Sequence, residues 1–134
     1  TDLQAYIGLS QIDKLDEWGK QRERNFESYQ TLIDNDYWKV KPQKDSFISN
    51  FAYPVIHPNR DKIVKKLQEN NIEVRPMICG SMGTQPFYVK EYRKLEFPNV
   101  SIIDKYGFYV PNHPHLKSAD IMLISHTINR GINV

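Results

Sequence analysis

Apolar residues recur every three or four positions over the first quarter of the chain, from Thr1 to about Ile33. The residues between them are mostly charged or amide-bearing and suit the exposed face of a helix. The positions expected to face inward are Ile12, Leu15, Phe26, Tyr29 and Ile33. The pattern predicts one long helix over residues 1–34. Such a helix would run roughly 45 Å, longer than a compact domain of this size, so part of it should pack on another domain or subunit. The apolar segment LQAYIGLSQI is the best candidate for that part.

After a polar link, the sequence predicts a strand and then a short helix. Residues 46–57 (SFISNFAYPVIH) predict a strand, and Pro54 indicates a sheet edge or a bulge because proline cannot donate a ladder hydrogen bond. A short helix is expected after Pro58-Asn59, with Ile63 and Leu67 facing inward and Asn70-Asn71 ending it.

The last part of the chain predicts two more short strands and a final helix. The strands cover residues 72–76 (IEVRP) and 107–111 (GFYVP), with a weak helical turn at residues 88–95 between them. Ser118 is expected to cap the last helix, whose inward positions are Ile121, Ile124 and Ile128. The order helix, strand, helix, strand, loop, strand, helix predicts an α+β fold in which helices cover one face of a small sheet.

Composition narrows the function classes. The 134 residues are 40% hydrophobic and 25% charged, which is ordinary for a globular domain. Eighteen basic against sixteen acidic residues leave no charge field that would favour nucleic acid or an anionic membrane as a partner. The single cysteine, Cys79, excludes an internal disulfide, and no apolar run has the length of a membrane span. We therefore expect a cytoplasmic protein with no nucleic-acid and no membrane partner.

The segment RPMICGSMGTQPFYVKEY, residues 75–92, is the strongest candidate for a site. Gly80 and Gly83 let backbone pass close to a neighbour, and Arg75 and Gln85 stand beside them. The planar fork of Arg75 suits a carboxylate or phosphate, and the amide of Gln85 can both donate to and accept from sugar hydroxyls. Equally open are a surface ion pair for Arg75 and a loop-stabilising hydrogen bond for Gln85.

Other reactive side chains carry weaker signals. His113 and His115 lie two positions apart, but no cysteine or carboxylate stands at ligand spacing, so we expect no metal. No base lies near Cys79 in sequence, and a small buried hydrophobe is a better interpretation than a nucleophile. The glycine loop lacks the lysine and hydroxyl that would make it a P-loop.

Three separated segments nevertheless resemble one enzyme family. TDLQAYIGLSQIDKLDEW, CGSMGTQPFY and GFYVPNHPHLKSADI are similar, in this order, to segments of the DegT/DnrJ/EryC1/StrS sugar aminotransferases, which use pyridoxal phosphate. The resemblance covers essentially the whole chain. It implies the C-terminal part of a fold type I enzyme: a long interdomain helix at residues 1–34, then a small domain at residues 35–134 with a mainly antiparallel sheet.

The resemblance also implies where the chemistry lies. In the family a lysine of the large domain, upstream of Thr1, holds pyridoxal phosphate, and the nucleotide sugar lies between domains and subunits. We therefore expect no catalytic residue in this chain, an inactive fragment when it is alone, and a homodimer at full length. The activity expected of the whole enzyme is transfer of an amino group from an amino acid to a nucleotide-linked keto-deoxysugar, as in surface polysaccharide or amino-sugar biosynthesis.

The residues expected to line the sugar site hold the substrate and do not react. They are Arg75, Gly80, Ser81, Thr84, Gln85, Phe87 and His113. Gly83 stands where many aminotransferases of the family have histidine, and Thr84 stands where a deoxyhexulose 3-dehydratase branch has arginine. The alternatives are therefore that dehydratase, or a non-catalytic module that binds a partner.

Overall fold

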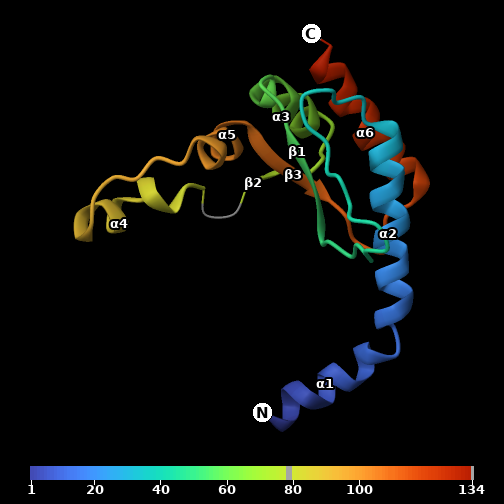
Figure 1. The fold of residues 1–134 in the computed structure, drawn as a ribbon. Helices are drawn as coiled ribbons and strands as arrows, with labels where there is room; N and C mark the ends of the chain where they lie inside the picture. Colours follow the sequence, from blue (N-terminus) through green and yellow to red (C-terminus); the bar gives the residue numbers. More distant parts are fainter. Residues whose placement is uncertain (78–79, 134) are drawn as a thin grey trace.

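The structure is a computed structural model that describes residues 1–77 and 80–133 (Figure 1). Cys79 lies outside the described residues. The helices are α1 (Asp2–Ile12), α2 (Leu15–Leu32), α3 (Arg60–Glu69), α4 (Pro86–Glu91), α5 (Pro98–Tyr106) and α6 (Ser118–Ile132). The strands are β1 (Ala52–Ile56), β2 (Arg75–Pro76) and β3 (Gly107–Pro111), and a single 3₁₀ turn, η1, spans Met82–Thr84. The prediction of an α+β fold is confirmed.

The described strands form an antiparallel sheet in the order β1-β3-β2. Tyr53 pairs with Val110, Val55 pairs with Phe108, and all four side chains are buried. β1 is an edge strand, as Pro54 predicted. Both outer strands are shorter than expected: β1 begins only at Ala52, and β2 keeps two of the five predicted residues. The sheet is therefore little more than β3 with a partner on each side.

Helices α2, α3 and α6 cover one face of this sheet (Figure 1). The core comprises Phe26, Tyr29, Ile33, Tyr53, Val55, Ile63, Leu67, Phe108, Val110, Ile121, Ile124 and Ile128. Burial of each large apolar side chain contributes about 1.5–3 kcal/mol, so this face holds most of the folding free energy of the domain. The inward positions predicted for α3 and α6 are confirmed, and Ile63, Leu67 and Ile128 are fully buried.

The predicted single helix over residues 1–34 is wrong, because the chain bends at Asp13 and Lys14. The amide of Lys14 donates to the carbonyl of Gln11 at 3.1 Å, a three-residue bond that ends α1. Beyond the bend the helix meets the rest of the chain: Trp18 packs edge-on against His115 with ring centroids 5.8 Å apart. The helical period runs unbroken through Ile12 and Leu15, so periodicity could not reveal this break.

α1 points away from the packed body (Figure 1). Against the described residues none of its side chains is buried, and Leu3, Tyr6, Ile7, Leu9 and Ile12 are all more than half exposed. Ile12 and Leu15 were expected to face inward, and both are exposed. Among residues 1–77 and 80–133, no helix combines the length and apolar character needed to cross a membrane.

Residues 80–106 form an arm that extends from the sheet, with α4 as its most distant helix (Figure 1). The sequence patterns assigned no helix to residues 98–106, where Val100, Ile102 and Ile103 weaken helix propensity but Pro98 takes the first helical position. Pro86 likewise starts α4 two residues before the predicted turn. The expected cap by Ser118 is wrong: Lys117 is the cap residue, and its amide donates to Asp120 Oδ2 at 2.8 Å.

The contact between α3 and α6 depends on Gly131. A Cβ placed there would lie 2.9 Å from the Cα of Ile63 and 2.7 Å from its Cγ1. Gly131→Ala should lower the free energy of unfolding by about 1–3 kcal/mol, although alanine is the better helix former. Gly8→Ala is the matched control, because a Cβ at Gly8 has no neighbour within 4 Å among the described residues. Urea unfolding of both variants measures the difference, and equal stabilities would contradict this packing.

His57 should make stability depend on pH. Its Nδ1 accepts a hydrogen bond from the amide of Asn59 at 3.0 Å, and burial lowers the pKa of the ring. Because the folded pKa lies below the unfolded value, the unfolded chain binds the proton more readily. The free energy of unfolding should therefore be highest above the ordinary histidine pKa of about 6.5 and should fall as the pH decreases from there through the folded pKa.

Replacing His57 tests this dependence. His57→Asn keeps a hydrogen-bond acceptor but cannot take up a proton in this pH range. We therefore expect its urea midpoint to vary less than that of the wild type between about pH 7.5 and about pH 5, on either side of the ordinary histidine pKa of about 6.5. His126→Asn, at an exposed position of α6, is the control and should leave the pH profile unchanged. An identical pH profile in the His57 variant would contradict the prediction.

Candidate active site

The face of the sheet opposite α2 and α6 carries the candidate site. Residues alternate between the two faces along β3, so Tyr109 and Pro111 point away from the core formed by Phe108 and Val110. Tyr109 pairs with Pro54 on one side and with Arg75 on the other. This register sets a tyrosine and an arginine side by side on the face without covering helices.

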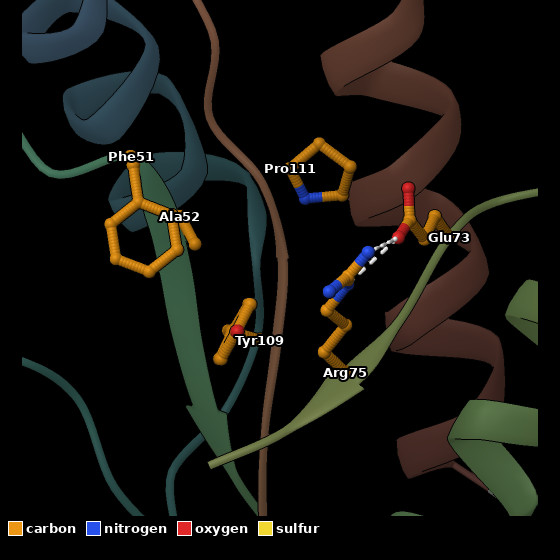
Figure 2. A pocket seen from close by; sticks show the side chains of 6 residues that line it. All are labelled: Phe51, Ala52, Glu73, Arg75, Tyr109 and Pro111. Atoms are coloured by element: carbon orange, nitrogen blue, oxygen red, sulfur yellow. Dashed lines mark hydrogen bonds and ion pairs between the residues drawn. The ribbon is translucent and has the colours of Figure 1, made fainter. Parts of the chain in front are cut away.

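A hollow of about 330 Å³ opens on this face. It is lined by Phe51, Ala52, Glu73, Arg75, Tyr109 and Pro111 (Figure 2). The rings of Phe51 and Tyr109 meet edge to face, with centroids 5.5 Å apart and planes at 82°. Edge-to-face pairs of this kind hold each other's orientation, so the hollow has a fixed aromatic side.

The charged side of the hollow is a single ion pair. Glu73 Oε1 accepts hydrogen bonds from both Nε and Nη2 of Arg75, each at 2.8 Å, and Figure 2 shows the two side chains facing each other. Both side chains are about two-thirds exposed. The bond to Glu73 is the main cause that raises the pKa of Arg75 above its already high value. The surface ion pair left open for Arg75 is thus present, and it lies inside a hollow.

The predicted loop residues lie together on the arm. Gly80 has φ of +57°, and a Cβ there would stand 2.5 Å from Asp104 Oδ1, so this glycine lets the loop approach α5. The carbonyl of Ser81 accepts both the amide and the hydroxyl of Thr84, at 3.1 and 3.0 Å. Gln85 is the N-cap residue of α4, and its carbonyl accepts the amide of Val89 at 3.0 Å. Phe87 is 61% exposed.

Ser81 is the unusual member of this group. Its side chain is 2% exposed, and its hydroxyl has no hydrogen-bond partner within the described ranges. Gly83 is buried beside it, and its carbonyl accepts the amide of Leu95 at 3.0 Å. A Cβ at Gly83 would overlap the carbonyl oxygen of Leu95, so that position has no room for a larger side chain.

His113 lies two residues beyond Pro111, at the end of β3 nearer α2. Its carbonyl accepts a hydrogen bond from Nδ2 of the buried Asn25 at 3.2 Å, and its own Nδ1 accepts the amide of His115 at 3.3 Å. These bonds fix the backbone and leave the ring exposed. In the described part of the chain, no three His, Cys, Asp or Glu side chains gather closely enough to hold a metal ion.

The predicted residues thus fall into three places. Arg75 lines the hollow, the residues from Gly80 to Phe87 lie on the arm, and His113 lies at the far end of β3. The residues that sequence reasoning missed are Phe51, Glu73, Tyr109 and Pro111. Two signals could have found Glu73 and Tyr109: Glu73 stands two positions before Arg75 in the predicted strand, and Tyr109 alternates with the apolar residues of β3.

Comparison with known proteins decides the family. Residues 1–129 match the sequence model of the DegT/DnrJ/EryC1/StrS aminotransferase family. The chain belongs to this family. The lipopolysaccharide biosynthesis protein RfbH of Salmonella typhimurium is 32% identical to it over 127 residues, which are 87% of this chain and 29% of RfbH. The chain spans about a third of the length of the curated relatives it matches.

Two solved enzyme structures share the fold. PseC of Helicobacter pylori, an aminotransferase of pseudoaminic acid biosynthesis, matches 97% of this chain and 37% of its own, with a TM-score of 0.84 and 20% identity. The E. coli GDP-4-keto-6-deoxy-D-mannose-3-dehydratase with bound hydrated pyridoxal phosphate matches 91% of this chain and 34% of its own, with a TM-score of 0.74 and 22% identity. At these identities the likeness shows the fold alone.

The lining of the hollow does not match pyridoxal phosphate. A phosphate site needs several hydrogen-bond donors and a positive charge that no carboxylate neutralises. Arg75 is the one cation among the described lining residues, and it is already paired with Glu73. The residues that line the hollow also include no lysine that could bond to the aldehyde of the cofactor. The hollow therefore does not fit the cofactor.

Proposed function

We propose that this chain is the C-terminal part of a pyridoxal-phosphate-dependent sugar aminotransferase. The whole enzyme would move an amino group from an amino acid to a nucleotide-linked keto-deoxysugar. Residues 1–34 would link the small domain, residues 35–134, to a large cofactor-binding domain. Family membership and the one-third length of the match support this division, and the exposed apolar side chains of α1 provide a surface for another domain to cover.

The observation that carries the proposal is the hollow on the uncovered sheet face. An aromatic pair beside a carboxylate and a guanidinium presents an apolar surface together with donors and acceptors, as polar organic ligands require. These side chains bind and orient: Arg75 stays protonated and offers donors, and Glu73 offers an acceptor. The cofactor supplies the amino-transfer chemistry when the large domain binds it.

The arm would form a second wall of the same substrate site. Gly80 and Gly83 let it fold tightly, and the buried hydroxyl of Ser81 has an unused donor. Thr84, Gln85, Phe87 and His113 are proposed as further substrate contacts. A homodimer that shares its sites across the interface is proposed for the whole enzyme.

A second function has specific support. The GDP-4-keto-6-deoxy-D-mannose 3-dehydratase of Yersinia pseudotuberculosis is 27% identical to this chain over 120 residues, and Gly83 leaves no space for the histidine that the family resemblance places in many aminotransferases. The alternative is therefore a deoxyhexulose 3-dehydratase, in which a histidine replaces the cofactor-binding lysine of the large domain. A non-catalytic binding module is the third possibility, and it predicts no cofactor at all.

One experiment separates the three functions. The full-length polypeptide that contains this chain is loaded with pyridoxal phosphate, treated with borohydride and weighed by mass spectrometry, with glutamate added to a parallel sample. An aminotransferase should keep the cofactor covalently after reduction, and glutamate should convert the cofactor to its amino form and prevent that attachment. Reversible binding that borohydride cannot fix would favour the dehydratase. Absence of binding would contradict both enzymes.

Residues 1–134 alone are the control in the same experiment. They should bind no cofactor covalently and transfer no amino group, because the residues around the hollow do not fit it. Cofactor fixed to this piece by borohydride would overturn the assignment of all reactive groups to the large domain.

A further inference from the structure

The hollow contains a balanced pair of charges. Its lining residues carry one negative charge on Glu73 and one positive charge on Arg75, and the other four are uncharged. An arginine that recognises phosphate normally offers its charge to the ligand, whereas this one faces a carboxylate of its own chain. A ligand phosphate would have to displace Glu73 or lie beside it, and like charges at short range repel.

Both charged groups still have unused hydrogen-bonding capacity. Glu73 Oε1 takes the two bonds from Arg75, and the second carboxylate oxygen has no partner among the described residues. Arg75 has five N–H donors, of which Glu73 engages two. A pair of neighbouring hydroxyls matches this arrangement, because one hydroxyl can donate to the carboxylate while the next accepts from the guanidinium.

The aromatic side of the hollow suits the same ligand. The rings of Tyr109 and Phe51 contact each other edge to face. The Tyr109 ring is half-buried, and Tyr109 pairs with Arg75 of the neighbouring strand β2. Aromatic rings next to polar groups bind molecules that are apolar on one face and polar at the rim. A pyranose ring has this character, with C–H bonds on its faces and hydroxyls around its edge.

We infer that the hollow binds the uncharged, hydroxyl-bearing ring of the sugar, and that Glu73 is the specificity residue that turns Arg75 from a phosphate binder into a hydroxyl binder. This inference deepens the proposed function and depends on it for the identity of the natural ligand. Glu73 acts in two ways: it accepts from one hydroxyl, and it cancels the charge that would otherwise attract the diphosphate of the nucleotide into the sugar position.

Glu73→Gln tests the inference because it removes the charge and keeps the shape. The side chain is about two-thirds exposed, so the variant should fold as the wild type does. The full-length polypeptide, without cofactor or amino donor, is titrated with methyl pyranosides of gluco, galacto and manno configuration and separately with inorganic phosphate. Amide chemical shifts of Ala52 and Tyr109 report occupancy of the hollow. Glu69→Gln, at the exposed end of α3, is the matched control.

The wild type should bind at least one pyranoside more tightly than phosphate. In Glu73→Gln, pyranoside affinity should fall and phosphate affinity should rise, so that their ratio drops by roughly tenfold or more, as expected for hydrogen bonds to charged groups. Glu69→Gln should leave the ratio unchanged. A residue that only supported the fold would change both affinities in the same direction.

Three results would overturn the inference: no pyranoside shift up to the solubility limit, phosphate bound more tightly than every pyranoside in the wild type, or an unchanged ratio in Glu73→Gln. The test is separate from that of the proposed function. Pyranoside binding with no cofactor chemistry would retain the hollow as a sugar site and reject the aminotransferase, and the converse result would reject the hollow alone.

Discussion

The alternation of side chains along β3 is the constraint on which the rest of this structure depends. Phe108 and Val110 are fully buried under α2, α3 and α6, where they contribute several kcal/mol together. Because successive residues of a strand point to opposite faces, Tyr109 and Pro111 must then face the other way. A shift of one residue in register would bury Tyr109 and expose Phe108, so the stability of the core also fixes the chemistry of the hollow.

Buried polar groups hold the C-terminal end of β3 to helix α2. Tyr29 donates its hydroxyl to the carbonyl of Pro111 at 3.0 Å, and Nδ2 of the fully buried Asn112 donates to the carbonyls of Asn50 and Arg22. Burial raises the pKa of Tyr29 well above its ordinary value. Burial also raises the pKa of Tyr53, to about 12, so both stay protonated donors at neutral pH. Such bonds are costly to break in a packed interior, and they keep Pro111, one wall of the hollow, in place.

The features that could be predicted from the sequence are those that depend on one helix or one strand alone. Ile63 and Leu67 of α3, and Ile121, Ile124 and Ile128 of α6, follow the helical period, and Pro54 marks an edge strand because of its missing donor. The bend at Asp13 and Lys14 could not be predicted, since it lies where the helix leaves the packed body and the period continues across it. Helix α5 was missed because its β-branched residues weaken the helical signal.

Only part of the site could be predicted from the sequence, because the rest depends on how separate segments come together. Arg75 stood out by its position before proline, and it does line the hollow. Its partner Tyr109 lies on β3 and Phe51 lies just before β1, so only the register of the sheet brings them to the arginine. The arm residues were found through their glycines, but they lie apart from the hollow in this chain. Their joint role requires a ligand or a second domain that spans both places.

The central claim is that the uncovered face of the sheet, and not the helical face, is turned toward the reacting sugar. The most direct test is a crystal structure of the full-length polypeptide with pyridoxal phosphate and a nucleotide sugar. The account predicts that Tyr109 and Arg75 face the cofactor domain and contact the sugar, while α6 lies on the distant side. A structure in which α2 and α6 line the sugar, with Tyr109 open to solvent, would contradict it.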